Sequence, residues 1–312
     1  MGDSDSLTPA KSATTEDTTM ASSPETLTSN TGESLEPGEV PAEAAADTAD
    51  EAAGTEATEK PEPRPAPPSV SENFGSGSAA QSLKVFDSEA SRASTKAILE
   101  GARYTWPEGV KPPQVIFDIG AYVGAASLAF AQQFPDAKIH AFEPNPHSAA
   151  LARENLAGKE KVELHEIAIW SKDEEARKLY DGKDDPLTAS VVPSTATGNQ
   201  SQPVKTEMGD NVLARLGFSR LDGLKISTGG SEVAVLESLI RHMESTPVVF
   251  IAYHSETDRR RIDLIICATH MLLGGEILGP HQGYLCYGLR RTLDRAASGD
   301  QDATRLHRTP HK

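Results

Sequence analysis

The sequence predicts an α/β domain in which helices cover both faces of a mostly parallel sheet of seven strands. Two observations lead to this prediction. Short apolar runs and helical patterns alternate five times between residues 89 and 273, and two further strand signals follow with no helix between them. Alternation of this kind is typical of a parallel sheet. The closing pair indicates one antiparallel strand near the sheet edge.

The first half of the domain alternates regularly between helix and strand. Val115, Ile116 and Phe117 form a short β-branched and aromatic run after two prolines, which is typical of a buried strand. The helical pattern that begins at Pro146 is expected to end at Gly158. The expected elements are helices over 89–104, 124–134 and 146–156, and strands over 115–117, 138–142 and 162–170.

The second half contains a less regular stretch. Residues 171–223 are rich in Asp, Gly, Pro, Ser and Thr and hold only short apolar pieces, so we expect an irregular or partly helical insertion there. Regular alternation then returns. The expected elements are strands over 223–226 and 248–253, helices over 231–243 and 258–273, and two final strands over 276–278 and 284–289.

Charge is distributed unevenly along the 312 residues. Residues 1–80 carry 16 acidic and 3 basic side chains, a net charge of −13, whereas the whole chain carries −16. The same segment has nine prolines and one aromatic residue, Phe74, so it cannot bury enough apolar surface to offset its ordering entropy. We expect a disordered, acidic, Pro/Ser/Thr-rich tail over 1–82, one domain over 83–295 and a flexible C-terminal tail over 296–312.

Several functional classes are disfavoured by composition. No apolar run approaches the roughly 18 residues of a membrane-spanning helix, and the N-terminus lacks the basic and apolar regions of a signal peptide. We therefore expect no membrane span and take a cytoplasmic location as the default. The acidic balance would repel a phosphate backbone, so nucleic acid is not an expected partner. Two cysteines are too few for a Cys-based zinc site, and His270 and His281 lack the spacing or partners of a metal site, so no metal is expected.

The clearest functional signal is the loop after the first strand of the sheet. The chain passes from Asp118 through Gly120, Ala121 and Tyr122 to Gly124 and then enters a helix. Glycines in such a loop let the backbone approach a ligand closely. Tyr122 occupies the second glycine position of the dinucleotide fingerprint, so that fingerprint fails, and no Walker lysine follows. The simplest alternative is that Asp118 caps a helix and the glycines only form a tight turn.

A second acid supports a cofactor site at this loop. Glu143 ends the second strand, 25 residues after Asp118, and is followed by Pro144 and Asn145. A carboxylate there can accept two hydrogen bonds from the diol of a ribose. An acid two residues before the first glycine suits a ligand with a positive amino group and a sulfonium better than a pyrophosphate. We therefore predict that S-adenosylmethionine binds here.

These residues resemble the FkbM-type methyltransferases. The resemblance lies in the 118–124 loop, in Glu143 and its neighbours, in Ala168 after the third strand, and in the fourth-strand segment 224–232; it covers roughly residues 113–290. It implies a Rossmann-like methyltransferase fold with S-adenosylmethionine as cofactor. The cofactor-binding residues that it implies are Asp118, Gly120, Ala121, Tyr122, Gly124, Glu143, Pro144, Asn145 and Ala168.

The fourth-strand segment departs from the family pattern. The family usually reads Lys-Ile-Asp-x-Glu-Gly-x-Glu, whereas this chain has Ser227 at the Asp position and Gly229 at the first Glu position. Lys225, one glycine and Glu232 match. At the end of the fifth strand the family often has Glu-x-His, of which only His254 remains. Three carboxylates are therefore missing from the expected substrate side.

The polar residues that remain on that side are candidates for catalysis. His254 is the expected general base, because it ends a strand and its unperturbed pKa is near 6.5; the alternative is an ordinary surface histidine. Lys225, the second catalytic candidate, either holds a substrate oxygen or forms a structural salt bridge with Glu232. Ser227 can donate a hydrogen bond to cofactor or substrate. Glu232 is a further substrate-side candidate, or else a first-turn acid favoured by the helix dipole.

The sequence and the resemblance together favour an S-adenosylmethionine-dependent methyltransferase that methylates a hydroxyl group of a small-molecule or glycan-like acceptor. One alternative is a degenerate member of the family that binds cofactor or a partner without turnover, and the missing carboxylates motivate it. Another is an interaction protein that uses its acidic tail and keeps the domain as a scaffold. The oligomeric state does not follow from the sequence.

Overall fold

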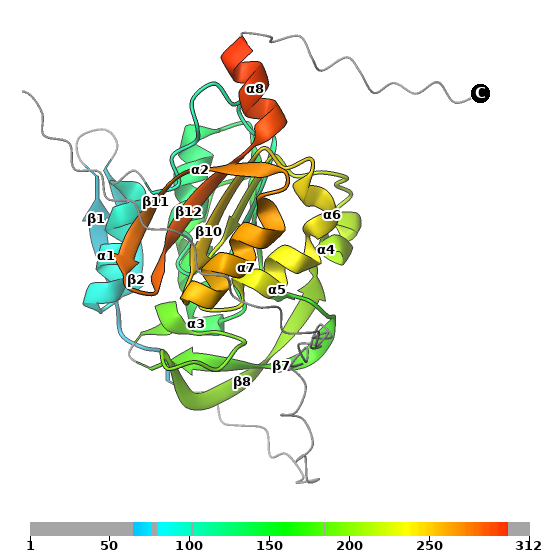
Figure 1. The fold of residues 1–312 in the computed structure, drawn as a ribbon. Helices are drawn as coiled ribbons and strands as arrows, with labels where there is room; N and C mark the ends of the chain where they lie inside the picture. The colour runs from blue at the N-terminus through cyan, green and yellow to red at the C-terminus, as the bar shows by residue number, and fades with distance from the viewer. Residues whose placement is uncertain (1–64, 76–79, 101–102, 184, 299–312) are drawn as a thin grey trace, which may run out of the picture. The chain divides into compact units, whose positions relative to one another are not determined.

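A seven-stranded sheet forms the centre of the domain (Figure 1). The computed structural model describes all residues except 1–64, 76–79, 101–102, 184 and 299–312. The strand order is β11-β12-β10-β9-β3-β4-β5, and β12 is antiparallel to both of its neighbours while the other pairs are parallel. The predicted fold class is therefore confirmed. The strands are β3 (Val115–Ile119), β4 (Lys138–Phe142), β5 (Val162–His165), β9 (Gly223–Ile226), β10 (Val248–Tyr253), β11 (His270–Gly279) and β12 (Gln282–Leu289).

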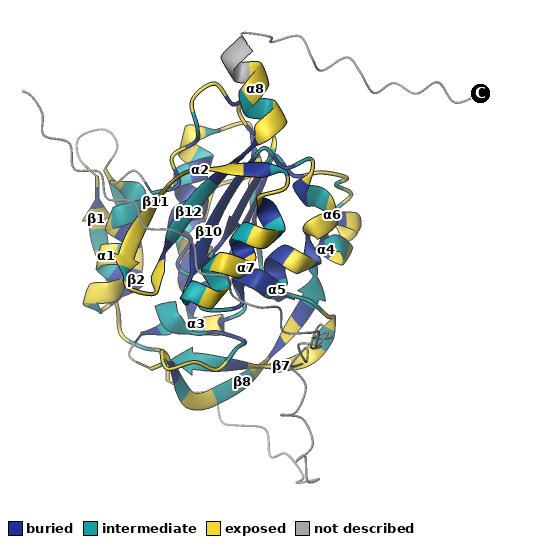
Figure 2. Ribbon diagram, viewed as in Figure 1, coloured by how far each residue is buried: buried dark blue, intermediate teal, exposed yellow. Residues whose placement is uncertain are grey.

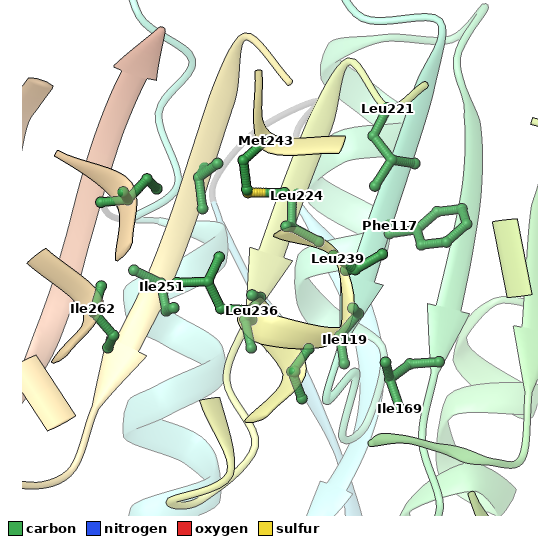
Figure 3. Close-up of a cluster of buried hydrophobic side chains, with 14 of the residues drawn as sticks. Phe117, Ile119, Ile169, Leu221, Leu224, Leu236, Leu239, Met243, Ile251 and Ile262 are labelled. Atoms are coloured by element: carbon green, nitrogen blue, oxygen red, sulfur yellow. The ribbon is translucent and has the colours of Figure 1, made fainter. Parts of the chain in front are cut away.

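Helices α4, α5 and α7 cover one face of the sheet. Figure 3 shows Phe117, Leu224 and Ile251 of the strands packed with Leu236 and Ile262 of the helices. All five side chains are almost completely buried, so this layer excludes water from one side of the central strands. The helices on this side are α4 (Gly209–Arg215), α5 (Glu232–Ser238), α6 (Ile240–Met243) and α7 (Glu256–Ile266).

The opposite face packs against α2, with α1 and α3 beside it. Because side chains alternate along a strand, Ile116 of β3 and Ile139 of β4 point to this side and pack with Phe130 of α2. Burial on both faces is what a parallel sheet requires, and Figure 2 shows β10 buried along its length. The helices are α1 (Glu89–Leu99), α2 (Ala125–Gln133) and α3 (Pro146–Asn155).

The segment 171–223 is more regular than we expected. β7 (Glu174–Gly182) and β8 (Thr197–Met208) pair antiparallel, and β6 (Ala168–Trp170) pairs parallel with β8, so a separate three-stranded sheet forms. The prediction of an irregular segment is wrong for residues 174–208, whereas the predicted helical part is present as α4. The strand expected over 162–170 divides between two sheets. The apolar pattern did not reveal β7 because most of its residues are exposed or only partly buried. A single turn, η2 (Pro186–Thr188), lies in the connection from β7 to β8.

Regular structure begins earlier than the predicted domain boundary. β1 (Ser69–Phe74) pairs antiparallel with β2 (Gln81–Phe86), and Phe74, Leu83 and Val85 are buried. The boundary predicted at residue 82 is therefore wrong for the described end of the expected tail. Residues 1–64 of that tail, and residues 299–312 of the expected C-terminal tail, lie outside the described part. The described residues all belong to one compact unit, and the last helix among them is α8 (Arg290–Ser298).

Several helix ends differ from the expected ones. α1 ends at Leu99 rather than at residue 104. α7 starts before residue 258 because the Ser255 hydroxyl accepts a hydrogen bond from the Asp258 amide and caps the helix. It stops at Ile266, and residues from His270 onward belong to β11, so the predicted helix is present but its predicted end at residue 273 is wrong. The helix expected over 231–243 divides into α5 and α6. In the described part of the chain, no helix combines the length and apolar character needed to cross a membrane.

Candidate active site

The loop after β3 is shaped by residues with left-handed backbone conformations. Gly120 has a φ of 81°, and Gly124, which precedes α2, has a φ of 87°. A Cβ atom at Gly120 would lie 1.9 Å from the backbone oxygen of Ser227, so only glycine fits between this loop and the end of β9. Tyr122 has a φ of 54° although it carries a side chain, which indicates that its surroundings hold it there.

Glu143 stands at the end of β4, next to this loop. Its Oε2 accepts a hydrogen bond from the Tyr122 amide at 2.7 Å, and its Oε1 accepts one from the Asn145 amide at 2.9 Å. Each oxygen keeps a lone pair for a ligand. The side chain is buried, and burial raises the pKa of Glu143 to about 7 even though the two amides favour the charged form.

A pocket opens beside the loop, at the carboxyl ends of the central strands. Lys225 and Ser227, predicted for the substrate side, lie in its wall, and Leu179 and Val191 of the insertion add apolar surface. Ligands of parallel α/β sheets bind at this edge. Six of the residues predicted to bind cofactor also line the pocket, namely Gly120, Ala121, Tyr122, Glu143, Pro144 and Ala168.

Asp118 does not line this pocket, contrary to our expectation of direct contact with the cofactor. It is completely buried within β3, where its Oδ2 accepts a hydrogen bond from the Ser127 hydroxyl at 2.6 Å. Lys225 Nζ lies 2.9 Å from Asp118 Oδ1 and donates to the backbone oxygen of Gly120 at 2.6 Å. The suggested salt bridge of Lys225 with Glu232 is therefore wrong. Through the hydrogen bond from Lys225 to Gly120, the Asp118–Lys225 pair connects the glycine loop to β3 and β9 and stabilises it.

Two more of the residues that were predicted to bind cofactor, Asn145 and Gly124, lie at the N-termini of helices. The Asn145 side-chain oxygen accepts hydrogen bonds from the amides of His147 and Ser148, at 3.0 Å and 3.4 Å, and so caps α3. Gly124 occupies the corresponding position before α2, without a side chain to cap it. Neither residue lines the pocket. Their roles in the structure are to direct the chain out of the loops that carry Tyr122 and Glu143.

Asp185 ties the insertion to the glycine loop, and sequence analysis did not single it out. The Tyr122 hydroxyl lies 2.8 Å from Asp185 Oδ1 and 2.9 Å from Ser91 Oγ of α1. Asp185 is buried, and it also accepts hydrogen bonds from the Ser88 hydroxyl and the Leu187 amide. Three segments that are distant in sequence are thereby held together at the wall of the pocket. The available sequence signal was an Asp before Pro, which is typical of a helix cap and does not indicate this contact.

His254 follows β10 and forms a pair with Glu232. Its Nδ1 lies 3.2 Å from Glu232 Oε1, and the two Glu232 oxygens also accept hydrogen bonds from the amides of Thr228 and Gly230. Burial disfavours the charge on each partner, but their attraction outweighs it, so the pKa of His254 is raised and that of Glu232 is lowered. The contact through Nδ1 leaves Nε2 as the nitrogen that can face a substrate. The His254 side chain keeps 36% of its surface exposed, whereas Glu232 is buried, and neither residue lines the pocket beside the glycine loop.

A group of potential metal ligands occurs in the described part of the chain, although we expected no metal site. His140 of β4 lies opposite Glu163 in the parallel register, and His165 lies two residues further along β5, so all three share a face. Their donor atoms lie within 4.8 Å of one another. His140 Nδ1 lies 3.0 Å from His165 Nε2. Burial lowers the pKa of His140 to about 4. A hydrogen bond between neutral rings accounts for this contact without an ion.

A family comparison adds to this geometry. The model of the methyltransferase FkbM domain matches residues 118–295, which is more than half of the chain. This chain belongs to that family. The match begins at Asp118 and runs through the glycine loop, Glu143, the insertion and His254. In this FkbM domain the strand order and the single antiparallel strand confirm the Rossmann-like methyltransferase fold that the sequence resemblance implied. Helix α1 precedes the match, yet its residues Ser94 and Thr95 line the pocket.

Individual proteins are similar to this FkbM domain either over a short segment or at low sequence identity. The 2-O-methyltransferase NoeI of Sinorhizobium fredii (strain NBRC 101917 / NGR234) is 42% identical over 59 residues, which are 19% of this chain and 24% of that relative. The precorrin-6y C5,15-methyltransferase of Geobacter metallireducens GS-15 is 14% identical, with a TM-score of 0.38 over 66% of this chain and 90% of the other. Fibrillarin of Aeropyrum pernix, in complex with S-adenosyl-L-methionine, is 10% identical, with a TM-score of 0.39 over 61% and 72% of the two chains.

Proposed function

We propose that this chain is an S-adenosylmethionine-dependent methyltransferase that methylates a hydroxyl oxygen of a small-molecule or glycan-like acceptor. The observation that carries the proposal is Glu143, whose carboxylate is buried in the pocket wall with one lone pair left on each oxygen. Membership of the FkbM family supports methyl transfer. The similarity to the 2-O-methyltransferase NoeI, over 24% of the length of that relative, supports an oxygen acceptor.

The residues present fit the proposed cofactor. Glu143 offers two acceptor oxygens to a ribose diol, and it is fixed from behind by the amides of Tyr122 and Asn145. Ala168, Leu179 and Val191 provide apolar surface for an adenine ring. Glu143 is the carboxyl group in the pocket wall, and in its charged form it favours a ligand that carries positive charge. Asp118 contributes through its pair with Lys225, as a positioning residue below the loop.

The bound cofactor would supply a methyl group on a sulfonium sulfur. The chain would hold the reactants in line, and much of the rate gain in such a transfer comes from positioning. Tyr122 and Asp185 hold the insertion against the pocket. His254 is the proposed general base, with Glu232 orienting its ring through Nδ1 and Nε2 accepting the proton of the acceptor hydroxyl.

Binding without turnover is the second candidate function. It is favoured by the turn after β9, where Ser227 and Gly229 stand at positions that carry acids in the family pattern. Glu232 is retained, but both of its oxygens are used by the turn and by His254. A chain of this kind would bind cofactor normally and yield no methylated product with any acceptor. Mass spectrometry of acceptor mixtures incubated with cofactor would distinguish the two functions.

The first experiment is a calorimetric titration of the full chain with S-adenosylmethionine and S-adenosylhomocysteine. We expect micromolar binding by the wild type. Glu143→Gln should weaken binding about 10- to 100-fold, because one charged hydrogen bond contributes roughly 1.5–3 kcal/mol. Glu163→Gln is the matched control, since Glu163 is exposed on β5 and does not line the pocket. A folded wild type that binds neither compound, or equal affinities for the two variants, would refute the proposed site.

A further inference from the structure

A second hollow lies on the α1 side of the sheet, next to the cofactor pocket. It is a groove between residues 103–108 and the strands β10, β12 and β11, and it encloses about 1300 Å³ together with its open mouth. Trp106, Phe250, Leu273 and Cys286 are among the residues that line it. The groove is open because β11, at the sheet edge, is exposed along almost all of its length, as Figure 2 shows.

The groove and the cofactor pocket meet at two tyrosines. Tyr104 and Tyr284 line both hollows, and their rings are perpendicular, with centroids 5.7 Å apart. The Tyr104 ring centroid lies 5.9 Å from Lys225 Nζ, in the wall of the cofactor pocket. Tyr104 has a φ of 65°, a conformation that costs free energy for a residue with a side chain. The strained backbone thus places this ring at the junction of the two hollows.

We infer that this groove binds the methyl acceptor, and that the acceptor is an aromatic hydroxyl compound; this inference rests on the proposed methyltransferase function. The groove is walled by the rings of Tyr104, Trp106, Phe250 and Tyr284, which make edge-to-face contacts with one another or with their neighbours. Such rings favour a flat apolar occupant. An occupant that reaches Tyr104 has its hydroxyl at the boundary with the cofactor pocket.

The polar groups of the groove favour a ring system over a sugar. Arg103 is nearly buried, lies 4.2 Å from the centroid of the Tyr284 ring and donates to Glu276 at 2.7 Å, so its charge is already paired. Burial raises the pKa of the Cys286 thiol to about 12, which keeps it neutral. Thr105, Glu108 and Glu276 would offer a sugar some hydrogen bonds, but aromatic and aliphatic side chains form most of the wall, so a sugar would lose more hydrogen bonds to water than it regains.

The transfer is balanced with the proposed cofactor alone. The bond from the sulfonium sulfur to the methyl carbon breaks as the bond from that carbon to the phenolic oxygen forms. The bonding electrons stay on sulfur, and the phenolic proton passes through water to Nε2 of His254, the general base proposed above. The products are an aryl methyl ether and S-adenosylhomocysteine. No oxidant or further reactant is required.

The test uses the full chain and 2-naphthol as the probe. Gly274→Leu should fill the groove without strain, because Gly274 pairs with Cys286 and a Cβ atom there would meet nothing within 4 Å. We expect saturable 2-naphthol binding by fluorescence, weakened at least tenfold in this variant, and formation of 2-methoxynaphthalene by the wild type. Ile277→Phe is the matched control, since it adds bulk at an exposed position of β11 that does not line the groove.

Parallel titrations with S-adenosylmethionine separate the two proposals. We expect unchanged cofactor affinity in Gly274→Leu. A wild type that binds cofactor but not 2-naphthol, equal binding of 2-naphthol by both variants, or bound 2-naphthol without methylated product would each overturn the groove assignment alone. Methylation of methyl β-D-glucopyranoside in preference to 2-naphthol would replace the aromatic acceptor by a sugar. Loss of cofactor binding in the wild type would instead overturn the proposed function.

Discussion

Removal of the Lys225 charge should destabilise the domain strongly. Lys225 is 3% exposed and Asp118 is not exposed at all, and Nζ and Oδ1 are 2.9 Å apart. Lys225→Met keeps much of the side-chain volume and leaves the Asp118 carboxylate buried with only the Ser127 hydroxyl bonded to it. The same change removes the hydrogen bond from Lys225 to the Gly120 backbone oxygen. Both losses fall on the strand and loop that shape the proposed cofactor site.

The size of the effect follows from distance and burial. Coulomb's law with an effective dielectric constant of about 20 gives roughly 6 kcal/mol of attraction at this separation. Part of it is recovered by local relaxation, and breaking a buried pair typically costs about 3–5 kcal/mol. We expect that loss in the free energy of unfolding for Lys225→Met. In a domain of this size it corresponds to a decrease in Tm of roughly 6–20 °C.

Urea denaturation at pH 7, followed by tryptophan fluorescence, measures this loss. Lys161→Met is the matched control, because Lys161 is also 2.9 Å from its partner Asp136 but both groups are exposed, so the expected cost is below about 1 kcal/mol. Asp118→Asn combined with Lys225→Met should be more stable than Lys225→Met by about 1–3 kcal/mol, since no unpaired charge remains. Strict additivity of the single variants, or equal costs at Lys225 and Lys161, would refute the reasoning.

Two further predictions concern the loop and the base. Gly120→Ala should unfold the loop locally and abolish cofactor binding in calorimetry, because its Cβ would lie 1.9 Å from the Ser227 backbone oxygen. Gly158 has a similar φ, but a Cβ there would meet nothing within 4 Å. Gly158→Ala should therefore lower the free energy of unfolding by only about 1 kcal/mol and bind cofactor normally. For His254, the raised pKa means that the ring stays protonated, and inactive as a base, to a higher pH than an ordinary histidine. In a plot of kcat against pH, the acidic limb should therefore lie at a higher pH than for an ordinary histidine, whose pKa is near 6.5. Glu232→Gln should shift this limb to lower pH. An unchanged limb would exclude the pair from catalysis.

The elements that sequence analysis located correctly are those whose side chains face the core. The strands around Phe117 and Leu224 are buried on both faces, so their continuous apolar runs stand out locally. β7 and β11 were misjudged for the opposite reason, since all but one residue of each strand is exposed or only partly buried, so neither strand carries a pattern of core-facing side chains. Within the candidate site, Gly120 and Glu143 were singled out from the sequence because a glycine in a loop and an acid at the end of a strand can be recognised from neighbouring residues.

The alternation of strands and helices in the central sheet, the glycine loop after β3 and the resemblance to FkbM-type enzymes could be predicted from the sequence alone, because they rest on local patterns and short spacings. Only the tertiary structure decided that Asp118 pairs with Lys225 and that Asp185 reaches Tyr122. It also decided that Tyr104 and Tyr284 meet between two hollows. These contacts join residues 63 to 180 positions apart, and which distant side chains become neighbours depends on strand order and packing, which no local spacing encodes.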